Sequence, residues 1–280
     1  MLTPQQQKKV EQAISLLQSV QKNWGGGEIE LAYSGGKDSD VILQLAKEAG
    51  INYRAIYKNT TIDIPGTIKH ALEVGAEIRR PKISFFKLIE KSSNPSRFHR
   101  HCCYHLKEYK ILDKCIMGVR KAESTARNKR YNEVTQCRFY GSKKNHVEAI
   151  YPILFWNDED VKAFILDRNI KVHPHYYDEN GNLDVTRRVG CMCCPLQSRR
   201  KRILEFKKYP RVLRQYIKRD QVFLDTHPNA KAHRYFANAY EVITNEILFD
   251  NVSEFKAWKT DMFGDKDCKA YLEEYFNIKL

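Results

Sequence analysis

The sequence lacks any hydrophobic run approaching the roughly 18 apolar residues that a membrane-spanning helix requires. Its first nine residues show neither the basic region nor the apolar region of a secretory signal peptide. No internal repeat or low-complexity tract interrupts the 280 residues, which excludes fibrous and repeat architectures. These absences predict a cytoplasmic globular protein without a membrane partner.

Acidic residues are in the minority. The chain has 34 Asp and Glu against 48 Lys and Arg, and its formal net charge is +14. This excess indicates an anionic partner such as a nucleotide or a nucleic acid, although a solvated basic surface has the same composition. The hydrophobic fraction of 42% is sufficient for a core, and the length allows one large domain or two small ones.

The most informative motif is Ser34-Gly35-Gly36-Lys37-Asp38-Ser39. It follows the apolar run 29–33 and precedes the periodic run 41–46, which is typical of a strand, a glycine loop and a helix. Adjacent glycines let the backbone approach an anion, and the first N–H groups of the helix favour negative charge. An ordinary turn needs the glycines but not the flanking polar residues. The motif therefore predicts a phosphate or pyrophosphate site, with a spacing unlike that of the Walker loop.

Strand and helix patterns alternate along the first two thirds of the chain. The expected strands are 29–33, 51–57, 76–78, 115–119 and 147–151. The expected helices are 5–22, 41–49, 65–74, 83–89, 159–166, 199–216 and 230–249. The alternation predicts an α/β fold with a doubly wound, mostly parallel sheet, whose ligands bind beyond the carboxyl ends of the strands. We expect a nucleotide-binding domain over residues 1–195 and a helical, basic C-terminal region over 196–280.

The glycine loop resembles the SGGxDS loop of the PP-loop ATP pyrophosphatases, a superfamily that cleaves ATP between its α and β phosphates. A second segment, Gly118 to Ser124 followed by Arg127, is similar to the G-(I/V)-R-x-x-E-S-x-x-R segment of the phosphoadenosine phosphosulfate (PAPS) reductase family within it. The stretches 151–161 and 173–177 resemble two further segments of this family. Altogether the resemblance covers about residues 28–200.

This resemblance implies a nucleotide site built from the loop and the arginine segment. The nucleotide-binding residues that it implies are Ser34, Gly35, Gly36, Lys37, Asp38, Ser39, Thr60, Gly118, Arg120 and Arg127. Lys37 would hold the pyrophosphate, Asp38 or Asp40 would hold Mg²⁺, and Arg120 would stabilise charge on the α-phosphate. Lys37, Asp38 and Arg120, together with Cys193 as a sulfur-handling thiol, are the implied catalytic residues.

Eight cysteines in a chain without a secretory signal indicate metal ligands rather than disulfides, because several of them are clustered. Cys102 and Cys103 are adjacent, and 87 residues separate them from the Cys191-x-x-Cys194 pair. This pattern is similar to that of adenosine phosphosulfate (APS) reductases, which implies a [4Fe-4S] cluster held by these four cysteines. A Cys₄ zinc site and inert thiols are the alternatives. Cys193 either replaces a ligand or lies beside the cluster.

The Glu-Cys-Gly-x-His tail of assimilatory reductases is missing, since Cys268 is followed by neither Gly nor His. The intact loop and the missing tail favour ATP over APS or PAPS as the nucleotide.

The resemblance therefore implies adenylation with pyrophosphate release, then sulfur transfer from a donor protein to DNA, tRNA or a small molecule, as in relatives that act in DNA phosphorothioation. The basic run 199–202 would guide the nucleic acid. The alternatives are an APS or PAPS reductase with Cys193 or Cys268 as nucleophile, and a non-catalytic nucleic-acid-binding protein with a structural cluster.

Overall fold

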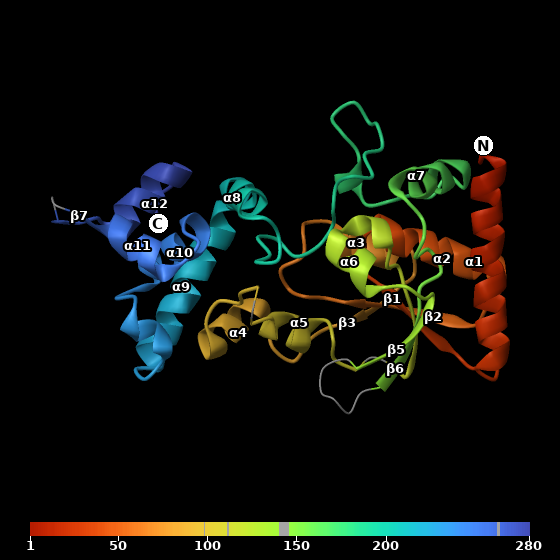
Figure 1. Cartoon of the computed structure of the whole chain (residues 1–280), viewed down its shortest axis with the longest axis horizontal. Helices are drawn as coiled ribbons and strands as arrows, with labels where there is room; N and C mark the ends of the chain where they lie inside the picture. Colours follow the sequence, from red (N-terminus) through yellow and green to blue (C-terminus); the bar gives the residue numbers. More distant parts are fainter. Residues whose placement is uncertain (98, 111, 140–145, 262–263) are drawn as a thin grey trace. The chain divides into compact units, whose positions relative to one another are not determined.

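The chain folds into two compact units, each composed of two segments. Unit 1 consists of residues 1–81 and 104–190, and unit 2 consists of residues 82–103 and 191–280. Figure 1 shows the elements of both units. None of the described helices is both long enough and apolar enough to cross a membrane. The computed structural model describes residues 1–97, 99–110, 112–139, 146–261 and 264–280.

A six-stranded sheet forms the centre of unit 1, with the strand order β3-β2-β1-β4-β6-β5. Its strands are β1 (Ile29–Tyr33), β2 (Tyr53–Lys58), β3 (Glu77–Arg79), β4 (Lys114–Met117), β5 (Thr135–Phe139) and β6 (His146–Ile150). Neighbouring strands pair in parallel, except that β5 runs antiparallel to β6 at one edge. The predicted doubly wound, mostly parallel α/β fold is confirmed. The edge strand β5 was not among the expected strands.

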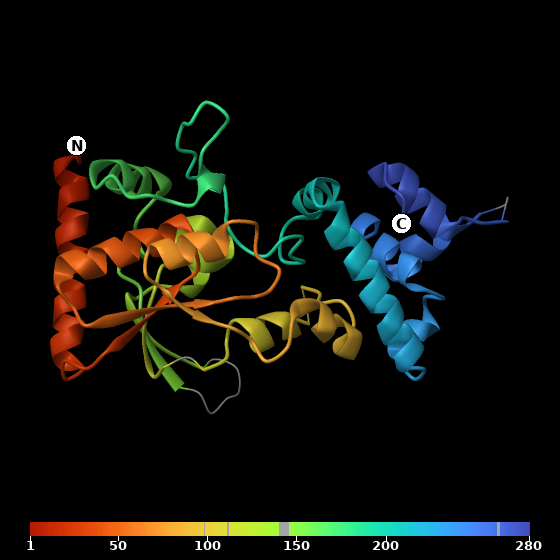
Figure 2. The same ribbon diagram turned by 180° about the vertical axis from the view of Figure 1, so that it is seen from behind.

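Helices flank this sheet. They are α1 (Pro4–Asn23), α2 (Lys37–Ala49), α3 (Thr67–Glu73), α6 (Thr125–Arg130) and α7 (Asp158–Asp167), with short 3₁₀ turns η1 (Lys121–Glu123) and η2 (Pro174–Tyr176). Ile29, Leu31 and Tyr33 alternate along β1 and join one core with the apolar faces of α1, α2 and α7. Figures 1 and 2 show α2 and α7 on the same side of the strands. This packing fixes the direction in which α2 leaves the end of β1.

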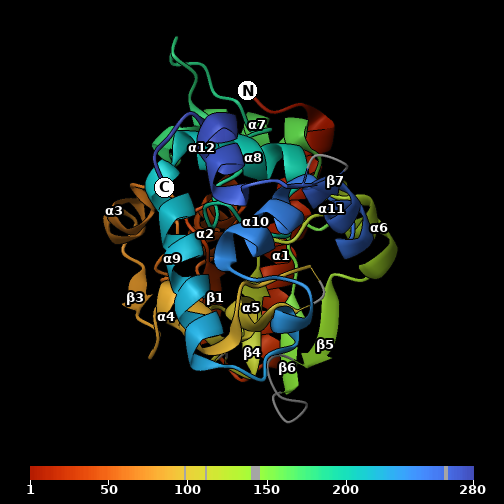
Figure 3. The ribbon, with the colours of Figure 1, turned by 90° about the vertical axis from the view of Figure 1, so that its left-hand side faces the viewer.

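Unit 2 is mainly helical. Its helices are α4 (Phe85–Ser92), α8 (Arg199–Lys208), α9 (Pro210–Thr226), α10 (Ala239–Leu248), α11 (Val252–Lys259) and α12 (Cys268–Phe276), with the 3₁₀ turn η3 (Lys231–Arg234). Two short strands, β7 (Thr260–Asp261) and β8 (Gly264–Asp265), also belong to it. Helix α5 (His101–Leu106) begins in unit 2 and ends in unit 1. Figure 3 shows α4 and α10 beside the long helix α9. The rings of Phe85 in α4 and Tyr216 in α9 lie 5.4 Å apart, and both side chains are buried.

Unit 2 resumes at residue 191, just before the expected boundary at residue 195. Residues 82–103, which were expected in the nucleotide-binding domain, group with the C-terminal helices. The apolar face of α4, formed by Phe85, Leu88 and Ile89, is buried. The helix expected over 199–216 is two helices, because Pro210 lacks the N–H that would continue the first and instead begins α9. The helix expected over 230–249 begins only at Ala239.

We predict that Phe85→Ala lowers the free energy of unfolding by about 3–5 kcal/mol, because it empties a buried ring position between α4 and α9. Hydrogen exchange should show the loss of protection in α4 and α9 and not in α1 or α2. The matched control is Phe155→Ala, since Phe155 is 58% exposed in unit 1. Equal loss of protection in α2 would contradict the grouping of α4 with unit 2.

Candidate functional site

The glycine loop connects the end of β1 to the start of α2, and each glycine in it has a different structural reason. Gly35 has a φ of +75°, and a Cβ atom there would lie only 2.5 Å from Cγ2 of Thr67. Gly36 has extended backbone, but its Cβ would lie 3.2 Å from the hydroxyl of Tyr176. The loop therefore needs both glycines to pass between α3 and the 173–177 segment.

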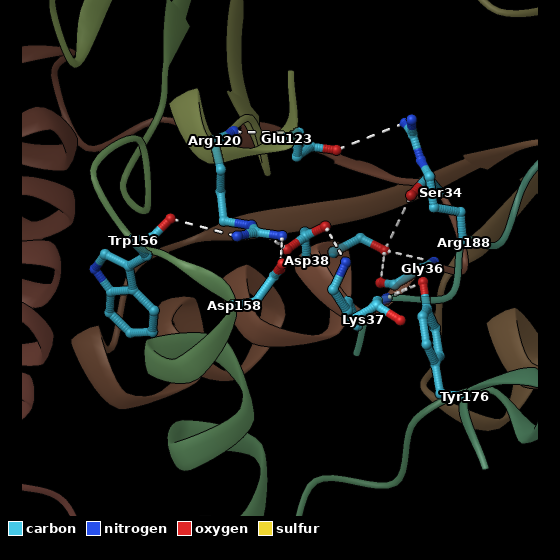
Figure 4. Close-up of polar contacts among 12 residues, drawn as sticks. Ser34, Gly36, Lys37, Asp38, Arg120, Glu123, Trp156, Asp158, Tyr176 and Arg188 are labelled. Atoms are coloured by element: carbon cyan, nitrogen blue, oxygen red, sulfur yellow. Dashed lines mark hydrogen bonds and ion pairs between the residues drawn. The ribbon is translucent and has the colours of Figure 1, made fainter. Parts of the chain in front are cut away.

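Polar groups of the loop gather at the N-terminus of α2. The Ser39 hydroxyl accepts a hydrogen bond from the Gly36 amide at 3.1 Å and donates to the Gly36 carbonyl at 2.6 Å. The Ser34 hydroxyl lies 3.3 Å from that of Ser39, and the Lys37 amide donates to the Tyr176 hydroxyl at 3.1 Å (Figure 4). Amides and hydroxyls at the start of a 13-residue helix form a site suited to an anion.

The Asp38 carboxylate lies between two cations. Lys37 Nζ is 3.2 Å from Oδ2, and Arg120 Nε donates to Oδ1 at 2.6 Å. Arg120 is 1% exposed, and its remaining contacts are the Asp158 carboxylate at 2.8 Å and the Trp156 carbonyl at 3.4 Å (Figure 4). These contacts make Arg120 a buried residue that positions Asp38. Its expected contact with phosphate stays a prediction.

Glu123 organises the remaining positive charge. One of its oxygens accepts a hydrogen bond from the Arg120 amide at 3.3 Å, and its carboxylate also pairs with Arg127. Arg188 Nη2 lies 3.7 Å from the same carboxylate. Burial, with the nearby Arg188 charge, lowers the pKa of Arg127. Arg188 was missed as a candidate ligand, because in sequence it is indistinguishable from Arg187, which pairs with a neighbouring aspartate.

Gly118 and Thr60 have structural roles in the places where nucleotide contacts were expected. A Cβ atom on Gly118 would lie 2.9 Å from the carbonyl oxygen of Asp38, so the glycine allows the end of β4 to approach α2 closely. Thr60 is buried just after β2, and its amide donates to the Asp63 carboxylate at 2.9 Å. Direct nucleotide contacts by these two residues stay predictions.

Asp40, the other candidate for holding Mg²⁺, is enclosed in unit 1. Its carboxylate accepts a hydrogen bond from the Tyr33 hydroxyl and lies 3.0 Å from Nε2 of His70. Burial raises the pKa of Asp40, against the lowering effect of these two partners. This arrangement ties α2 to β1 and α3. Of the two aspartates in the first turn of α2, Asp38 is therefore the one whose carboxylate lies beside the loop.

The four cysteines expected to hold a cluster all lie in unit 2. The Cys102 thiol makes a hydrogen bond with Cys103 and interacts electrostatically with Cys194 and Cys191. The Cys103 contact, together with burial and the other two sulfurs, raises the pKa of Cys102. The fold thus brings together two pairs that are 87 residues apart in sequence. Within the described residues, no group of three or more His, Cys, Asp or Glu side chains is placed to hold a metal ion.

Cys193 differs from these four cysteines. Its φ is +53°, its amide donates to the Glu205 carboxylate, and its carbonyl accepts from Arg202 Nε at 3.2 Å and the Tyr216 hydroxyl at 3.4 Å. The side chain is 0% exposed, and burial raises the pKa of its thiol. A buried thiol of this kind is a weak nucleophile, which disfavours the catalytic role that was expected for Cys193.

The basic run 199–202 does not form one charged face. Arg199 pairs with Asp250, and Arg202 is buried against Glu246 at 3.2 Å, while the two residues between them are exposed. Unit 2 as a whole still contains 22 Lys and Arg against 13 Asp and Glu. Its positive charge is therefore spread over the unit rather than concentrated in this run.

Residues 28–197, more than half of the chain, match the family model of the phosphoadenosine phosphosulfate reductase domain. The chain belongs to this family. The match confirms the family expected from the loop and the 118–127 segment. In this PAPS reductase-like protein the matched range ends just beyond the Cys191–Cys194 loop.

Known proteins similar to this chain share modest identity with it. An uncharacterized protein of Methanocaldococcus jannaschii is 26% identical over 204 residues, which cover 68% of this chain and 46% of that protein. An FMN adenylyltransferase of Candida glabrata, in complex with FMN and an ATP analog, is 15% identical with a TM-score of 0.44, over 64% of this chain and 62% of that one. A phosphoadenylyl-sulfate reductase of Candida auris is 16% identical with a TM-score of 0.41, over 62% and 90%. The chain thus spans less than two thirds of the length of the M. jannaschii protein and of the FMN adenylyltransferase.

We predict that Gly118→Ala lowers the free energy of unfolding by about 1–3 kcal/mol, because the new methyl group meets backbone atoms of Asp38 that cannot rotate away. Denaturant unfolding measures the change. Gly27→Ala is the matched control, since a Cβ atom there meets nothing within 4 Å. If both variants are as stable as the wild type, the packing role assigned to Gly118 is wrong.

Proposed function

We propose that this protein is an ATP pyrophosphatase that adenylates an acceptor and releases pyrophosphate, as the first half of a sulfur transfer. The observation that carries the proposal is the arrangement at the start of α2, where amides, two hydroxyls and Lys37 converge beside Asp38. Membership of the PAPS reductase family supports a nucleotide as the ligand.

The residues of unit 1 suit the parts of ATP in turn. The amides and hydroxyls from Ser34 to Ser39 would bind the β and γ phosphates, with Lys37 neutralising their charge. Asp38, which Arg120 holds in place, would supply a carboxylate oxygen to Mg²⁺. Arg127 and Arg188, both near Glu123, would face the growing charge at the α-phosphate.

The chemical step then follows from these positions. An oxygen of the acceptor attacks the α-phosphorus, the bond to the α–β bridging oxygen breaks, and pyrophosphate leaves with the electron pair. Hydrosulfide from a separate donor next attacks the activated position of the acceptor, a bond to sulfur forms, and the bond to the AMP oxygen breaks, so that AMP leaves with the electron pair. Under this scheme the protein stabilises charge and positions the reactants, and it needs no nucleophilic cysteine for the first step.

Family membership favours a second candidate function, the reduction of APS or PAPS. That reaction needs a reactive thiol to attack sulfur, and Cys193 or Cys268 was expected to provide it. Both side chains are buried, at 0% and 5% exposure, and burial raises the pKa of both thiols. Their surroundings therefore support ATP chemistry over sulfonucleotide reduction.

We propose that Cys102, Cys103, Cys191 and Cys194 hold a [4Fe-4S] cluster. Each iron of such a cluster takes one thiolate, so the sulfurs surround a volume instead of meeting at a single ion. That requirement fits the Cys102 thiol, which contacts Cys103 and interacts with Cys191 and Cys194. When bound, the cluster would supply electrons or a site for sulfide. Cys194, and not the buried Cys193, completes the set.

Nucleic acid is the acceptor class that the charge of unit 2 supports. Its excess of Lys and Arg includes the exposed residues Arg200 and Lys201 of α8. Such a surface would bind the phosphates of DNA or tRNA without reading their sequence.

We predict that the purified protein releases pyrophosphate from ATP only with Mg²⁺ and with a nucleic-acid acceptor such as a tRNA or DNA mixture. Lys37→Ala should reduce the rate by about 10²–10³-fold, because it removes a cation from the site where charge develops. A coupled pyrophosphate assay measures both.

Lys171→Ala is the matched control for this assay, since Lys171 is exposed and pairs only at the surface. Formation of sulfite from APS or PAPS, without pyrophosphate release from ATP, would support the reductase instead. Salt-sensitive nucleic-acid binding without either activity would support a non-catalytic binding protein.

We predict that anaerobically purified protein contains about four iron and four sulfide atoms per chain. Cys194→Ser should lose most of this iron, whereas Cys193→Ser and Cys268→Ser should retain it. Iron and acid-labile sulfide analysis, with the visible absorption spectrum, measures the loading. Full iron content in Cys194→Ser would refute the proposed ligand set.

A further inference from the structure

Tyr176 brings a distant segment of unit 1 onto the glycine loop. It belongs to η2, 139 residues beyond Lys37 in sequence, and its side chain is 2% exposed. Its hydroxyl is close enough to Gly36 that a Cβ atom there would lie 3.2 Å from it. The ring also contacts Lys37, whose Nζ lies 5.7 Å from the ring centroid (Figure 4). Tyr176 therefore forms one wall of the anion site.

Two backbone amides hold the Tyr176 hydroxyl in place. The Lys37 amide donates to it at 3.1 Å, and the interactions with the Lys37 and Val189 backbone both lower the pKa of Tyr176. A hydroxyl that accepts a hydrogen bond from an amide still has its own proton to donate. The Tyr176 hydroxyl can therefore still donate a hydrogen bond through its own proton.

That proton has no acceptor among the residues that the structure describes. Burial raises the pKa of Tyr176 to about 12, with the nearby charge of Asp38 adding to the effect, so the proton stays bound at neutral pH. A buried O–H group without an acceptor is costly, and the cost is removed when a ligand supplies one. The adjacent loop is built to bind oxygen-rich anions.

We infer that the Tyr176 hydroxyl donates a hydrogen bond to the phosphate chain held by the glycine loop. The inference rests on the proposed phosphate site and names a further ligand for it. In this role the Lys37 and Val189 amides act through Tyr176, since they aim its proton at the bound oxygen. The 173–190 segment would thereby contribute directly to the nucleotide site.

The experiment is isothermal titration of inorganic pyrophosphate into wild type and Tyr176→Phe, which keeps the ring over Lys37 and removes only the hydroxyl. We expect the dissociation constant to rise about tenfold or more, the typical effect of losing a hydrogen bond to a charged acceptor. Binding of adenosine, which has no phosphate, should be unchanged. Tyr177→Phe is the matched control, because Tyr177 is the neighbouring residue and is 37% exposed.

Two results would overturn the inference. Equal pyrophosphate affinity in wild type and Tyr176→Phe would show that the hydroxyl does not contact the anion. Tighter binding by Tyr176→Phe would show that the hydroxyl competes with the anion for the Lys37 amide. If Tyr176→Phe does not fold, 3-fluorotyrosine at position 176 is the alternative, because it keeps the hydroxyl and makes it a stronger hydrogen-bond donor. Pyrophosphate should then bind more tightly than to the wild type. Unchanged or weaker binding would refute the proposed role of the hydroxyl.

Because this titration requires no turnover, it separates the inference from the proposed function. A protein that binds pyrophosphate through Tyr176 but never releases it from ATP would refute the function and leave the inference intact. If the protein turns over ATP, and if Tyr176→Phe binds pyrophosphate as tightly as the wild type, the proposed function stands and the inference is refuted.

Discussion

The ion pair between Asp38 and Arg120 is the contact on which the candidate site at the glycine loop depends. It joins the first turn of α2 to the segment after β4. The two residues are 82 apart in sequence, but the strands that precede them, β1 and β4, are neighbours in the sheet. Arg120 is almost fully buried, and a buried guanidinium must be paired with acceptors to be tolerated. Asp38 and Asp158 supply that pairing, so the charge on Arg120 fixes the orientation of the carboxylate at the loop.

Each cation around this pair has a carboxylate partner within the site. Lys37 pairs with Asp38, and Glu123 is shared by Arg127 and Arg188. A phosphate chain would enter as a new partner for cations that already have one, and would not fill an uncompensated positive pocket. This pairing reduces the repulsion among basic residues that lie close together, and the Glu123 carboxylate provides it for both Arg127 and Arg188.

Local patterns predicted the glycine loop, its strand and helix, the parallel sheet and the family, because all of these depend on short-range periodicity and on residues close in sequence. Such patterns did not predict that α4 would join unit 2, since an amphipathic helix shows which face is buried and not what covers it. Nor did they separate Arg187 from Arg188 or Cys193 from Cys194. Neighbours in sequence point in different directions, and only tertiary contacts decide which one enters a site.

The sequence by itself determined that a glycine loop with flanking polar residues follows the first strand and that two cysteine pairs are available in one chain. The spacing of these residues is enough for both predictions, because the backbone conformation open to glycine and the ligand chemistry of cysteine are properties of single residues. The tertiary structure decided the rest. It enclosed Asp40 and Cys193, committed Arg120 to carboxylates, and set the Tyr176 hydroxyl against the loop, because burial and pairing arise from residues far apart in sequence.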